Sequence, residues 1–398
     1  MNVKIYIRYR IDILNIQYEN KKLLLINELY RCNVYMERPT IILVGYGWAS
    51  IGFLQTIDHT RFRVKVVSAN DRFVYTPLLA KTVIQERDLE IPFTSQFPHH
   101  EFHLAEVKDV DIEKQGVVTT TNNLVSGDIL ILAHGANVNT FQIPGVQEHT
   151  QFLKTHSDLL AIKAKLRDLD NNAIIAVIGC GFTGSELVGT LTDSPRFRVV
   201  AIDGLPGPMP TFSPDLSSKA IELWKKNHVQ MHFNTMVTKI EADKIHTKKE
   251  EVIPYDFAIW CGGIKIHPLS EKVNAQLGNS EDADRRGIVI NEYLEIMGAK
   301  SQCYAMGDCA ITGNPPTAQV AHQQGTYLAH SLNMGQRRPF VFQNRGQFGY
   351  IGQGHSLYQG KYFKGSGRLV GMMNKTMHVY YFFKLQSGSN SDITRFFP

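Results

Sequence analysis

The sequence predicts an α/β fold, because short apolar runs alternate with amphipathic stretches from Thr40 onward. A second observation is an internal repeat: an apolar run, a glycine-rich turn and a helical stretch follow one another at 41–57 and again at 174–192. The first glycines of the two turns, Gly45 and Gly179, are 134 residues apart. That separation is too long for a solenoid period and suits two copies of a nucleotide-binding domain. We therefore expect two Rossmann-type dinucleotide-binding domains in one chain.

The composition excludes several classes of protein. Hydrophobic residues make up 43% of the 398 residues and charged residues 20%, a balance typical of a globular protein with two or three domains. The net charge of +5 is small for this length, so we expect no nucleic-acid partner; anionic cofactors or an anionic surface suit it equally well. No run of 18 apolar residues is present, and the five cysteines form no CxxC pair. We expect neither a membrane-spanning helix nor a metal site.

Each predicted strand is a short apolar run of the kind that forms buried parallel strands. Helical patterns lie at 157–169 and 215–227. Residues 1–35 match neither a secretory signal nor a mitochondrial presequence, because acidic residues interrupt them; one explanation is that Met36 is the real start. The predicted strands are 41–44, 64–67, 129–132, 174–178, 199–202 and 257–260.

The first glycine-rich turn has the pattern GxGxxS. Gly45 allows the tight turn off the strand, Gly47 lets a pyrophosphate approach the backbone, and Ser50 takes the small third position where helix packs on strand. The acid expected about 20 residues later is missing, and Ser68 holds its place. Alone, this pattern also fits a plain strand-to-helix turn.

The second turn is a full GxGxxG, formed by Gly179, Gly181 and Gly184. The next predicted strand ends in Asp203, 24 residues after Gly179. A carboxylate there can accept both ribose hydroxyls and repel a 2′-phosphate, which favours NAD(H) over NADP(H). The alternative is that Asp203 is only a turn residue. Two dinucleotide sites imply that one carrier passes electrons to the other, as in a flavoprotein that uses a nicotinamide.

Further motifs resemble those of the glutathione-reductase-like flavoproteins. The stretch 304–310 (YAMGDCA) resembles their flavin motif, and 132–137 and 260–263 resemble their two crossover turns. Within that superfamily the chain resembles the type II, non-proton-pumping NADH:quinone oxidoreductases. Four motifs in family order carry this closer resemblance: GYGWAS at 45–50, NDRFVYTPLL at 70–79, FQIPGV at 141–146 and PPTAQVAHQQG at 315–325.

The resemblance implies electron transfer from NADH through non-covalent FAD to a membrane quinone, with Asp308 hydrogen-bonded to the flavin ribityl chain. The cofactor-binding residues that it implies are Gly45, Gly47, Trp48, Ala49, Ser50, Thr76, Pro77, Leu78, Ala133, Gly135, Gly179, Gly181, Gly184, Asp203, Gly262, Gly263, Asp308, Ala318 and Gln319.

Four residues are the candidate catalytic groups. The resemblance implies that Glu186 lies near the contact of nicotinamide and flavin; the alternative is a first-turn glutamate stabilised by the helix dipole. Gln319, His322 and Gln323 follow one another at spacings of three and four, so we expect them to share a helix face. The family places this helix against the flavin and the quinone headgroup, where the amides hold a carbonyl and His322 passes a proton. The alternative for His322 is an ordinary solvated or core histidine.

The tail at 372–385 combines aromatics, methionines and lysines, as interfacial segments do. The resemblance implies peripheral contact with an energy-conserving membrane, the mitochondrial inner membrane in a eukaryote or the cytoplasmic membrane in a bacterium, and a homodimer is a further possible partner. The alternative for the tail is an ordinary packing helix. The expected divisions are an N-terminal extension (1–37), the FAD domain (38–155 and 269–350), the NADH domain (156–268) and a C-terminal membrane-associating segment (351–398).

Two other functions stay open. One is another FAD-dependent pyridine-nucleotide oxidoreductase on the same scaffold, such as a sulfide:quinone or ferredoxin-type reductase; Asp203 and the lack of paired cysteines oppose it. The other is a redox flavoprotein of the apoptosis-inducing type, with little quinone reductase activity.

Overall fold

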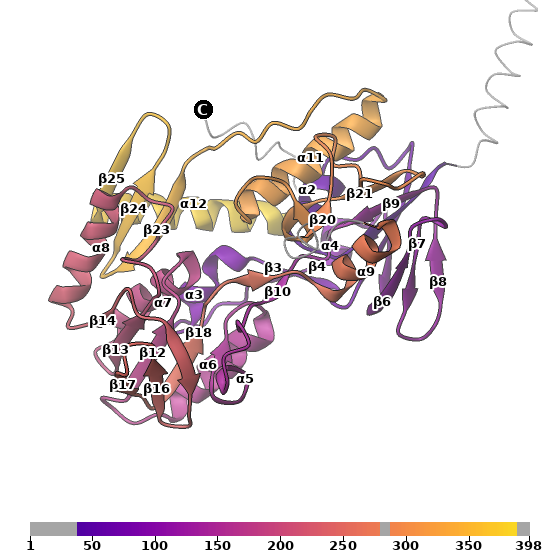
Figure 1. Cartoon of the computed structure of the whole chain (residues 1–398). Coiled ribbons are helices and arrows are strands. Elements are labelled where there is room, and N and C mark those ends of the chain that lie inside the picture. Colours follow the sequence, from indigo (N-terminus) through magenta and orange to yellow (C-terminus); the bar gives the residue numbers. More distant parts are fainter. Residues whose placement is uncertain (1–37, 279–286, 388–398) are drawn as a thin grey trace, which may run out of the picture.

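The computed structural model describes residues 38–278 and 287–387. The predicted N-terminal extension and the last eleven residues of the predicted membrane-associating segment therefore lie outside the described residues. Figure 1 shows two α/β units joined to a smaller C-terminal unit of strands and one long helix.

The first unit contains a five-stranded parallel sheet in the order β21-β9-β1-β2-β5. Its central strand β1 has β2 on one side and β9 on the other. The strand order reverses at β1, because the chain adds β2 and β5 on one side and later β9 on the other. Open α/β sheets bind ligands beyond the carboxyl ends of the strands at such a switch point. The strands are β1 (Thr40–Val44), β2 (Arg63–Ser68), β5 (Glu101–Leu104), β9 (Ile129–Leu132) and β21 (Cys303–Ala305).

The second unit repeats this arrangement around β12, in the order β11-β18-β12-β13-β14. All of its pairings are parallel. The six strands predicted from the sequence are confirmed, each within one residue at either end. The strands are β11 (Gln151–Phe152), β12 (Ile174–Ile178), β13 (Arg198–Ile202), β14 (Gln230–His232) and β18 (Phe257–Trp260).

Each sheet carries an antiparallel excursion, which comes before the fourth strand of the first sheet in chain order and before the fifth strand of the second. Strands β6 (Val107–Asp111), β7 (Gly116–Thr119) and β8 (Leu124–Ser126) precede β9, and strands β15 (Val237–Ile240), β16 (Lys244–Thr247) and β17 (Val252–Pro254) precede β18. The internal repeat therefore extends beyond the glycine turns to four strands and the antiparallel excursion of each unit (Figure 1). The remaining edge strand differs, because β21 follows β9 in the chain whereas β11 precedes β12.

The remaining short elements connect these sheets or cover them. The two helices predicted from the sequence are confirmed as α6 and α8, each shifted by one residue. The connecting elements are β3 (Arg72–Val74), η1 (Thr76–Leu78), α3 (Leu79–Thr82), β4 (Glu90–Pro92), α4 (Phe93–Gln96), β10 (Asn137–Val138), α5 (Val146–His149), α6 (His156–Asp168), α8 (Pro214–Lys226), β19 (Ile264–Lys265), α9 (Pro268–Leu277), β20 (Ile288–Val289), η2 (Gly307–Cys309) and β22 (Ala310–Ile311).

Two helices cross at very short range in the first unit. The helix α2 (Trp48–Leu54) follows the first glycine turn, and α11 (Ala318–Met334) lies across it. A Cβ added at Gly325 would lie 1.9 Å from the carbonyl oxygen of Ala49, so only glycine permits this approach. The crossing fixes the start of α11 next to the carboxyl ends of the first sheet.

The C-terminal unit is the antiparallel sheet β23 (Gln347–Gly352), β24 (His355–Gln359) and β25 (Lys364–Gly367), followed by α12 (Arg368–Gln386). It is held to the second unit by the bond from Trp224 Nε1 to the Ile351 carbonyl (3.0 Å), and to the first by Gln96 Nε2 donating to the Leu385 carbonyl (2.5 Å). In the part of the chain described, no helix combines the length and the apolarity needed to cross a bilayer.

The division of the chain into domains stays a prediction. In the structure β11 already pairs with β18 of the second sheet, although it precedes the expected boundary at residue 155. Strand β21 returns to the first sheet beside β9, so the first unit contains two segments far apart in the sequence.

Candidate active site

The first glycine turn follows β1, at the switch point of the first sheet. Gly45 has φ +97° and its N–H donates to the Val67 carbonyl (2.9 Å), which fixes the turn against β2. Ser50 is fully buried, and its hydroxyl donates to the Gly45 carbonyl (2.8 Å), so it secures helix to strand at the predicted third position. A Cβ added at Gly47 would meet nothing within 4 Å. The protein alone therefore leaves open space at Gly47, as a pyrophosphate requires.

This turn opens into a cavity of about 680 Å³ at the carboxyl ends of the first sheet. Ser68 stands in its wall at the end of β2, where dinucleotide sites often carry an acid. Lys154 also lines the cavity. The sequence analysis missed it, and its place beside the start of α6 was the one signal for it. The predicted cofactor residues in its wall are Gly45, Gly47, Trp48, Thr76, Ala133 and Gly135.

Other predicted cofactor residues lie behind the cavity wall, in α2, η1 and α11, and support it. Trp48 Nε1 donates to Thr76 Oγ1 (2.8 Å), which ties α2 to η1. Ala49 and Leu78 are buried, while Pro77 lies within η1 and Ala318 begins α11. Ala49, Pro77, Leu78 and Ala318 therefore lie in the first unit but not in the cavity wall.

Asp308 lines an adjoining cavity of about 370 Å³. The two cavities lie close together, since the consecutive residues Gly135 and Ala136 line one each. Burial raises the pKa of Asp308, and the charge of Lys154 opposes this rise. Gln324, which the sequence analysis missed, is fully buried; its Oε1 accepts from the Gly307 N–H (2.7 Å), while its Nε2 has no partner among the described residues. A buried amide group without a partner beside Asp308 fits a bound polar molecule.

The second glycine turn repeats the first. Gly179 has φ +92°, and its N–H donates to the Ile202 carbonyl (2.8 Å). A Cβ at Gly181 would meet nothing within 4 Å, whereas a Cβ at Gly184 would lie 1.8 Å from the Gly179 carbonyl oxygen. The middle glycine therefore leaves room for a ligand, and the third glycine lets α7 (Phe182–Thr192) pack on the strand.

Asp203 stands beside this turn at the end of β13. Its carboxylate accepts from the backbone N–H of Cys180 and from that of Leu205 (2.7 Å for the second). A carboxylate has about four acceptor positions, so these bonds orient the group and leave capacity for ribose hydroxyls. The neighbouring crossover turn contains Gly262, where a Cβ would lie 2.6 Å from the Trp260 ring, and Gly263, with φ +116°.

A third cavity, of about 730 Å³, connects the two halves of the site. It begins at Phe182, directly after Gly181, and reaches Pro315 and Thr317 before α11. Pro315 and Thr317 also line the cavity of Asp308. The three neighbouring cavities thus follow one another along a path between the two glycine turns, passing Asp308.

Glu186 lies in α7 and faces both neighbouring units. Its Oε1 accepts from the Tyr350 N–H of β23 (3.0 Å). Burial raises the pKa of Glu186, and the nearby Lys81 of α3 opposes the rise. Lys81 lies over the Tyr350 ring at 4.8 Å, and burial lowers its own pKa. The sequence analysis missed Lys81 and Tyr350; the only signal for Lys81 was an isolated charge in the apolar TPLLAKT stretch.

Gln319, His322 and Gln323 all lie on α11, as the sequence predicts, but their side chains have different partners. Gln319 bonds to the Gly346 carbonyl (3.1 Å) and accepts from the Arg345 N–H (3.0 Å); Gln323 makes the same pair of bonds with the backbone of Gln343 (2.9 and 3.0 Å). Both amides therefore bind the segment 343–346. Spacing alone could not show this, because the partners come from beyond the helix.

His322 contacts residues of and next to α2 instead. Its side chain is 9% exposed in total residue area, its Nε2 lies 3.3 Å from Gln55 Oε1, and its ring lies 6.5 Å from that of Trp48. Trp48 in turn packs edge-on against Tyr75 (5.4 Å). His322 thus contacts the aromatic side of the first glycine turn, while the two glutamines do not.

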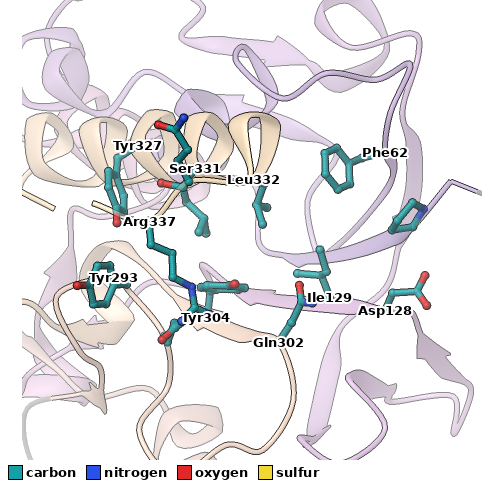
Figure 2. A pocket seen from close by; sticks show the side chains of 15 residues that line it. Phe62, Asp128, Ile129, Tyr293, Gln302, Tyr304, Tyr327, Ser331, Leu332 and Arg337 are labelled. Carbon is teal, nitrogen blue, oxygen red and sulfur yellow. Dashed lines mark ion pairs between the residues drawn. The ribbon is translucent and has the colours of Figure 1, made fainter. Parts of the chain in front are cut away.

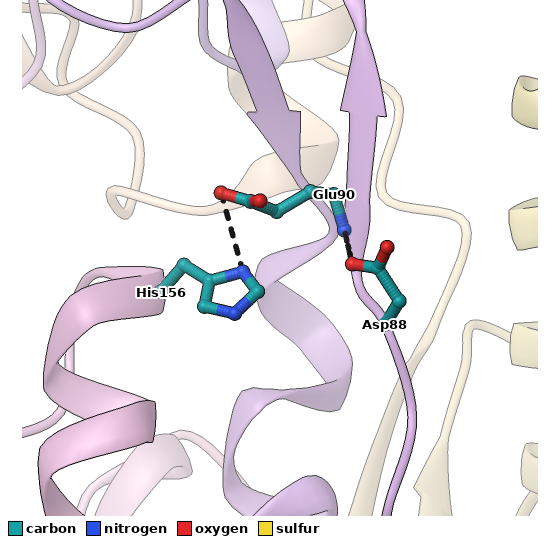
Figure 3. Close-up of side chains that lie close together, drawn as sticks. All are labelled: Asp88, Glu90 and His156. Atoms are coloured by element: carbon teal, nitrogen blue, oxygen red, sulfur yellow. Dashed lines mark hydrogen bonds and ion pairs between the residues drawn. The ribbon is translucent and has the colours of Figure 1, made fainter.

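Two further groupings lie outside this path. Figure 2 shows a cavity of about 500 Å³ with Tyr304, Tyr327 and Arg337 in its wall; it lies at the amino ends of the first sheet and contains no predicted site residue. Figure 3 shows Glu90 paired with His156 Nδ1 (3.2 Å), while its N–H donates to Asp88 (2.9 Å). The ligand atoms of these three residues lie within 4.8 Å of one another, close enough to hold a metal ion, but Glu90 is already paired with His156.

Comparison with known proteins gives concordant matches. The sequence model for pyridine nucleotide-disulphide oxidoreductases matches residues 39–325. A probable mitochondrial NADH-ubiquinone oxidoreductase of Schizosaccharomyces pombe is 33% identical over 77% of this chain and 66% of its own length. The external alternative NADH-ubiquinone oxidoreductase of Yarrowia lipolytica mitochondria is 30% identical over 74% of this chain and 59% of its own length. The chain therefore spans slightly less than two thirds of these relatives.

Among solved structures, NDH2 from Plasmodium falciparum in complex with NADH superposes with a TM-score of 0.80. The match covers 88% of this chain and 97% of that one, at 20% sequence identity. At this identity the likeness establishes the fold and its two-unit arrangement.

Proposed function

Because the chain belongs to the pyridine nucleotide-disulphide oxidoreductase family, we propose that it transfers electrons from NADH, through a non-covalently bound FAD, to a membrane quinone without pumping protons. The observation that carries this proposal is the path of three adjoining cavities between the two glycine turns. Its relatives named as NADH-ubiquinone oxidoreductases support the choice of substrates.

The residues present fit FAD in the first unit. Gly47 leaves the backbone open to a pyrophosphate, and the start of α2 supplies free N–H groups and the positive end of the helix dipole. Asp308 would hold the ribityl hydroxyls, and the unpartnered Nε2 of Gln324 is available beside it. When bound, the flavin supplies hydride and electron transfer, which side chains cannot perform.

The second unit would hold NADH in the same manner. Gly181 admits the pyrophosphate, and Asp203 accepts from the adenosine ribose hydroxyls. The nicotinamide end would enter the cavity that begins at Phe182. Glu186, with its raised pKa, would keep or exchange a proton next to this end and help to orient it.

His322 is the residue of α11 that we assign to the quinone side. It is the candidate that contacts Trp48, whereas Gln319 and Gln323 hold the segment 343–346 in position. An imidazole can pass a proton to a quinone as the quinone is reduced. The two glutamines then act as positioning residues for the wall of the third cavity, which includes residues of that segment.

Peripheral membrane contact is part of the proposal. α12 exposes Leu369, Met372 and Phe383 to solvent, with exposed fractions between 60% and 72%. Apolar side chains on one exposed helix face suit an interfacial helix. The relatives are named as mitochondrial proteins, so we assign the chain to a mitochondrial membrane. Formation of a homodimer stays a prediction.

A visible spectrum of the purified protein tests the proposal. We expect flavin absorbance that bleaches with NADH under anaerobic conditions and returns with a short-chain quinone. Bleaching without return would instead favour the redox flavoprotein with little quinone reductase activity. Bleaching by sulfide or reduced ferredoxin in preference to NADH would favour another reductase of the same scaffold.

A further inference from the structure

A cavity of about 280 Å³ lies apart from the path described above, between α3, the end of α7, β23 and α12. Three cationic side chains line it: Lys81, Arg87 and Lys375. In the described part of the chain no ion pair joins any of the three to a carboxylate, although Lys81 lies near Glu186. The cavity is therefore a concentration of positive charge.

The one carboxylate in the cavity wall offsets only part of this charge. Asp193 accepts from the Tyr350 hydroxyl (2.6 Å) and from the Gln353 N–H (2.6 Å). Its negative charge opposes the lowering of the Lys81 pKa, but it is one carboxylate among three cations. His378 also lines the cavity. Burial lowers its pKa to about 3, and the positive charges of Lys81 and Arg87 add to this lowering. This histidine stays neutral at physiological pH and adds a polar group, bonded to the Tyr75 hydroxyl at 3.1 Å.

An apolar stripe on α12 borders the cavity. Its side chains are 46% to 72% exposed, although all are large and apolar. At about 100° per residue they fall within about 100° of the helix surface. Met372 belongs to both the stripe and the cavity wall, and Lys375 follows it one turn later. The members of the stripe are Leu369, Met372, Met373, Tyr380 and Phe383.

We propose that this cavity binds the phosphate of one anionic phospholipid, whose acyl chains lie along the apolar stripe of α12. Charge complementarity selects the occupant: three cations require an anion, and an adjoining apolar stripe requires hydrocarbon. A neutral quinone would not need the cations, and inorganic phosphate would not need the stripe. The inference rests on the proposed peripheral contact with a membrane.

Vesicle co-sedimentation at physiological ionic strength tests this site. The vesicles contain phosphatidylcholine alone or with a minor fraction of phosphatidylglycerol. We expect the unmutated protein to favour the second kind, and Arg87→Gln with Lys375→Gln to weaken that binding about tenfold to thirtyfold. Arg87→Lys with Lys375→Arg keeps both charges and should bind like the unmutated protein.

A matched control separates this site from diffuse charge. Lys248→Gln with Lys249→Gln removes the same charge from an exposed turn between β16 and β17, far from α12 in Figure 1, and should leave binding unchanged. Met372→Ser with Phe383→Ser should weaken binding to both kinds of vesicle. Circular dichroism checks that each variant is folded.

Three results would overturn the proposal: equal binding by the Arg87/Lys375 variant and the unmutated protein, an equal loss in the Lys248/Lys249 control, or release by inorganic phosphate but not by chloride of the same ionic strength. The last result would assign the cavity to a free anion. Sedimentation needs no turnover, so normal lipid binding by a protein that fails to reduce quinones would contradict only the proposed function.

Discussion

At the scale of single residues, Asp203 shows how a motif residue becomes a specificity group. The sequence places a carboxylate after the second strand of the second unit, and the structure turns it toward the glycine loop, where the Cys180 N–H holds it. Because these backbone hydrogen bonds hold the Asp203 carboxylate in place, it cannot move away from the 2′-phosphate of NADPH. We therefore expect its charge, rather than its size, to decide between NADH and NADPH.

The Asp203→Asn variant tests this expectation, because an amide keeps an acceptor oxygen and loses the charge. Hydrogen bonds to charged groups contribute about 1.5–3 kcal/mol, so the ratio of kcat/KM for NADH over NADPH should fall about tenfold to a hundredfold. Steady-state kinetics with both nucleotides measures the ratio. An unmutated protein that uses both equally well would contradict the assignment.

Glu186 allows a prediction about pH. Because burial raises its pKa, the folded protein binds this proton more tightly than the unfolded chain does. Its stabilising contribution is complete below the unfolded pKa of about 4.3 and is lost as pH rises through the folded pKa. The Glu186→Gln variant cannot ionise, so its Tm relative to the unmutated protein should become steadily more favourable as pH rises.

Thermal unfolding at a series of pH values, without nucleotide, measures this slope. The absolute Tm is not the test, since Lys81 also loses a neighbouring charge in the variant. Glu222→Gln, an exposed change on α8, is the control and should shift the slope little. Parallel Tm profiles for Glu186→Gln and the unmutated protein would show that Glu186 has an ordinary pKa.

At the scale of elements, each glycine turn combines two requirements that the sequence pattern does not distinguish. Gly45 is needed by the protein itself, since its φ is +97° and a Cβ would lie 2.5 Å from the Ala133 carbonyl oxygen. Gly47 is not: its surroundings are open. The open space beside Gly47 is therefore available to a ligand.

We expect Gly47→Val to fold but to lose FAD, and Gly45→Val to unfold or express poorly. Flavin absorbance per protein and circular dichroism measure the two properties separately. The Gly47 variant should also lack the stabilisation that a bound ligand contributes by mass action. Full flavin content in Gly47→Val would remove the first turn from the FAD site.

The helix α11 shows the limit of periodicity as an argument. Spacings of three and four correctly place Gln319 and Gln323 near each other, and the predicted helix is present. Their partners are backbone groups of 343–346, and His322 is directed to α2 instead. Periodicity states which side chains share a side of a helix; the fold decides what lies opposite that side.

At the scale of the whole molecule, the two substrates should meet different parts of the site. Glu186 lies between the second unit and the C-terminal strands, whereas His322 lies between α11 and α2. Changing His322 to Ala should slow flavin reoxidation by quinone about a hundredfold, the lower end of the range for a general acid. Changing Gln323, which only positions the cavity wall, to Ala should slow reoxidation less, and both variants should leave bleaching by NADH nearly intact. Glu186→Gln should show the opposite pattern.

Stopped-flow absorbance resolves the two half-reactions, since flavin bleaching and its return are recorded separately. The Glu186 variant is the control for the variants at His322 and Gln323, and they are the control for it. If the variants at His322 and Gln323 lose the NADH step and keep the unmutated rate of reoxidation, the quinone side does not lie at α11.

The sequence by itself determined the two α/β units, their six central strands, both glycine turns and Asp203. These features are local: a strand, a tight turn and a helix start depend on residues within a few positions of one another. The motif match to a family then supplied the remaining cofactor residues.

Only the tertiary structure decided which residues face one another. It joined the two glycine turns through three cavities, brought Lys81 and Tyr350 to Glu186, separated His322 from the two glutamines, and set an apolar stripe of α12 beside three cations. These neighbours are far apart in the chain, as Lys81 and Tyr350 are at 269 residues, so no spacing within the sequence records them. Packing of separate elements creates such pairs, and packing is a property of the whole fold.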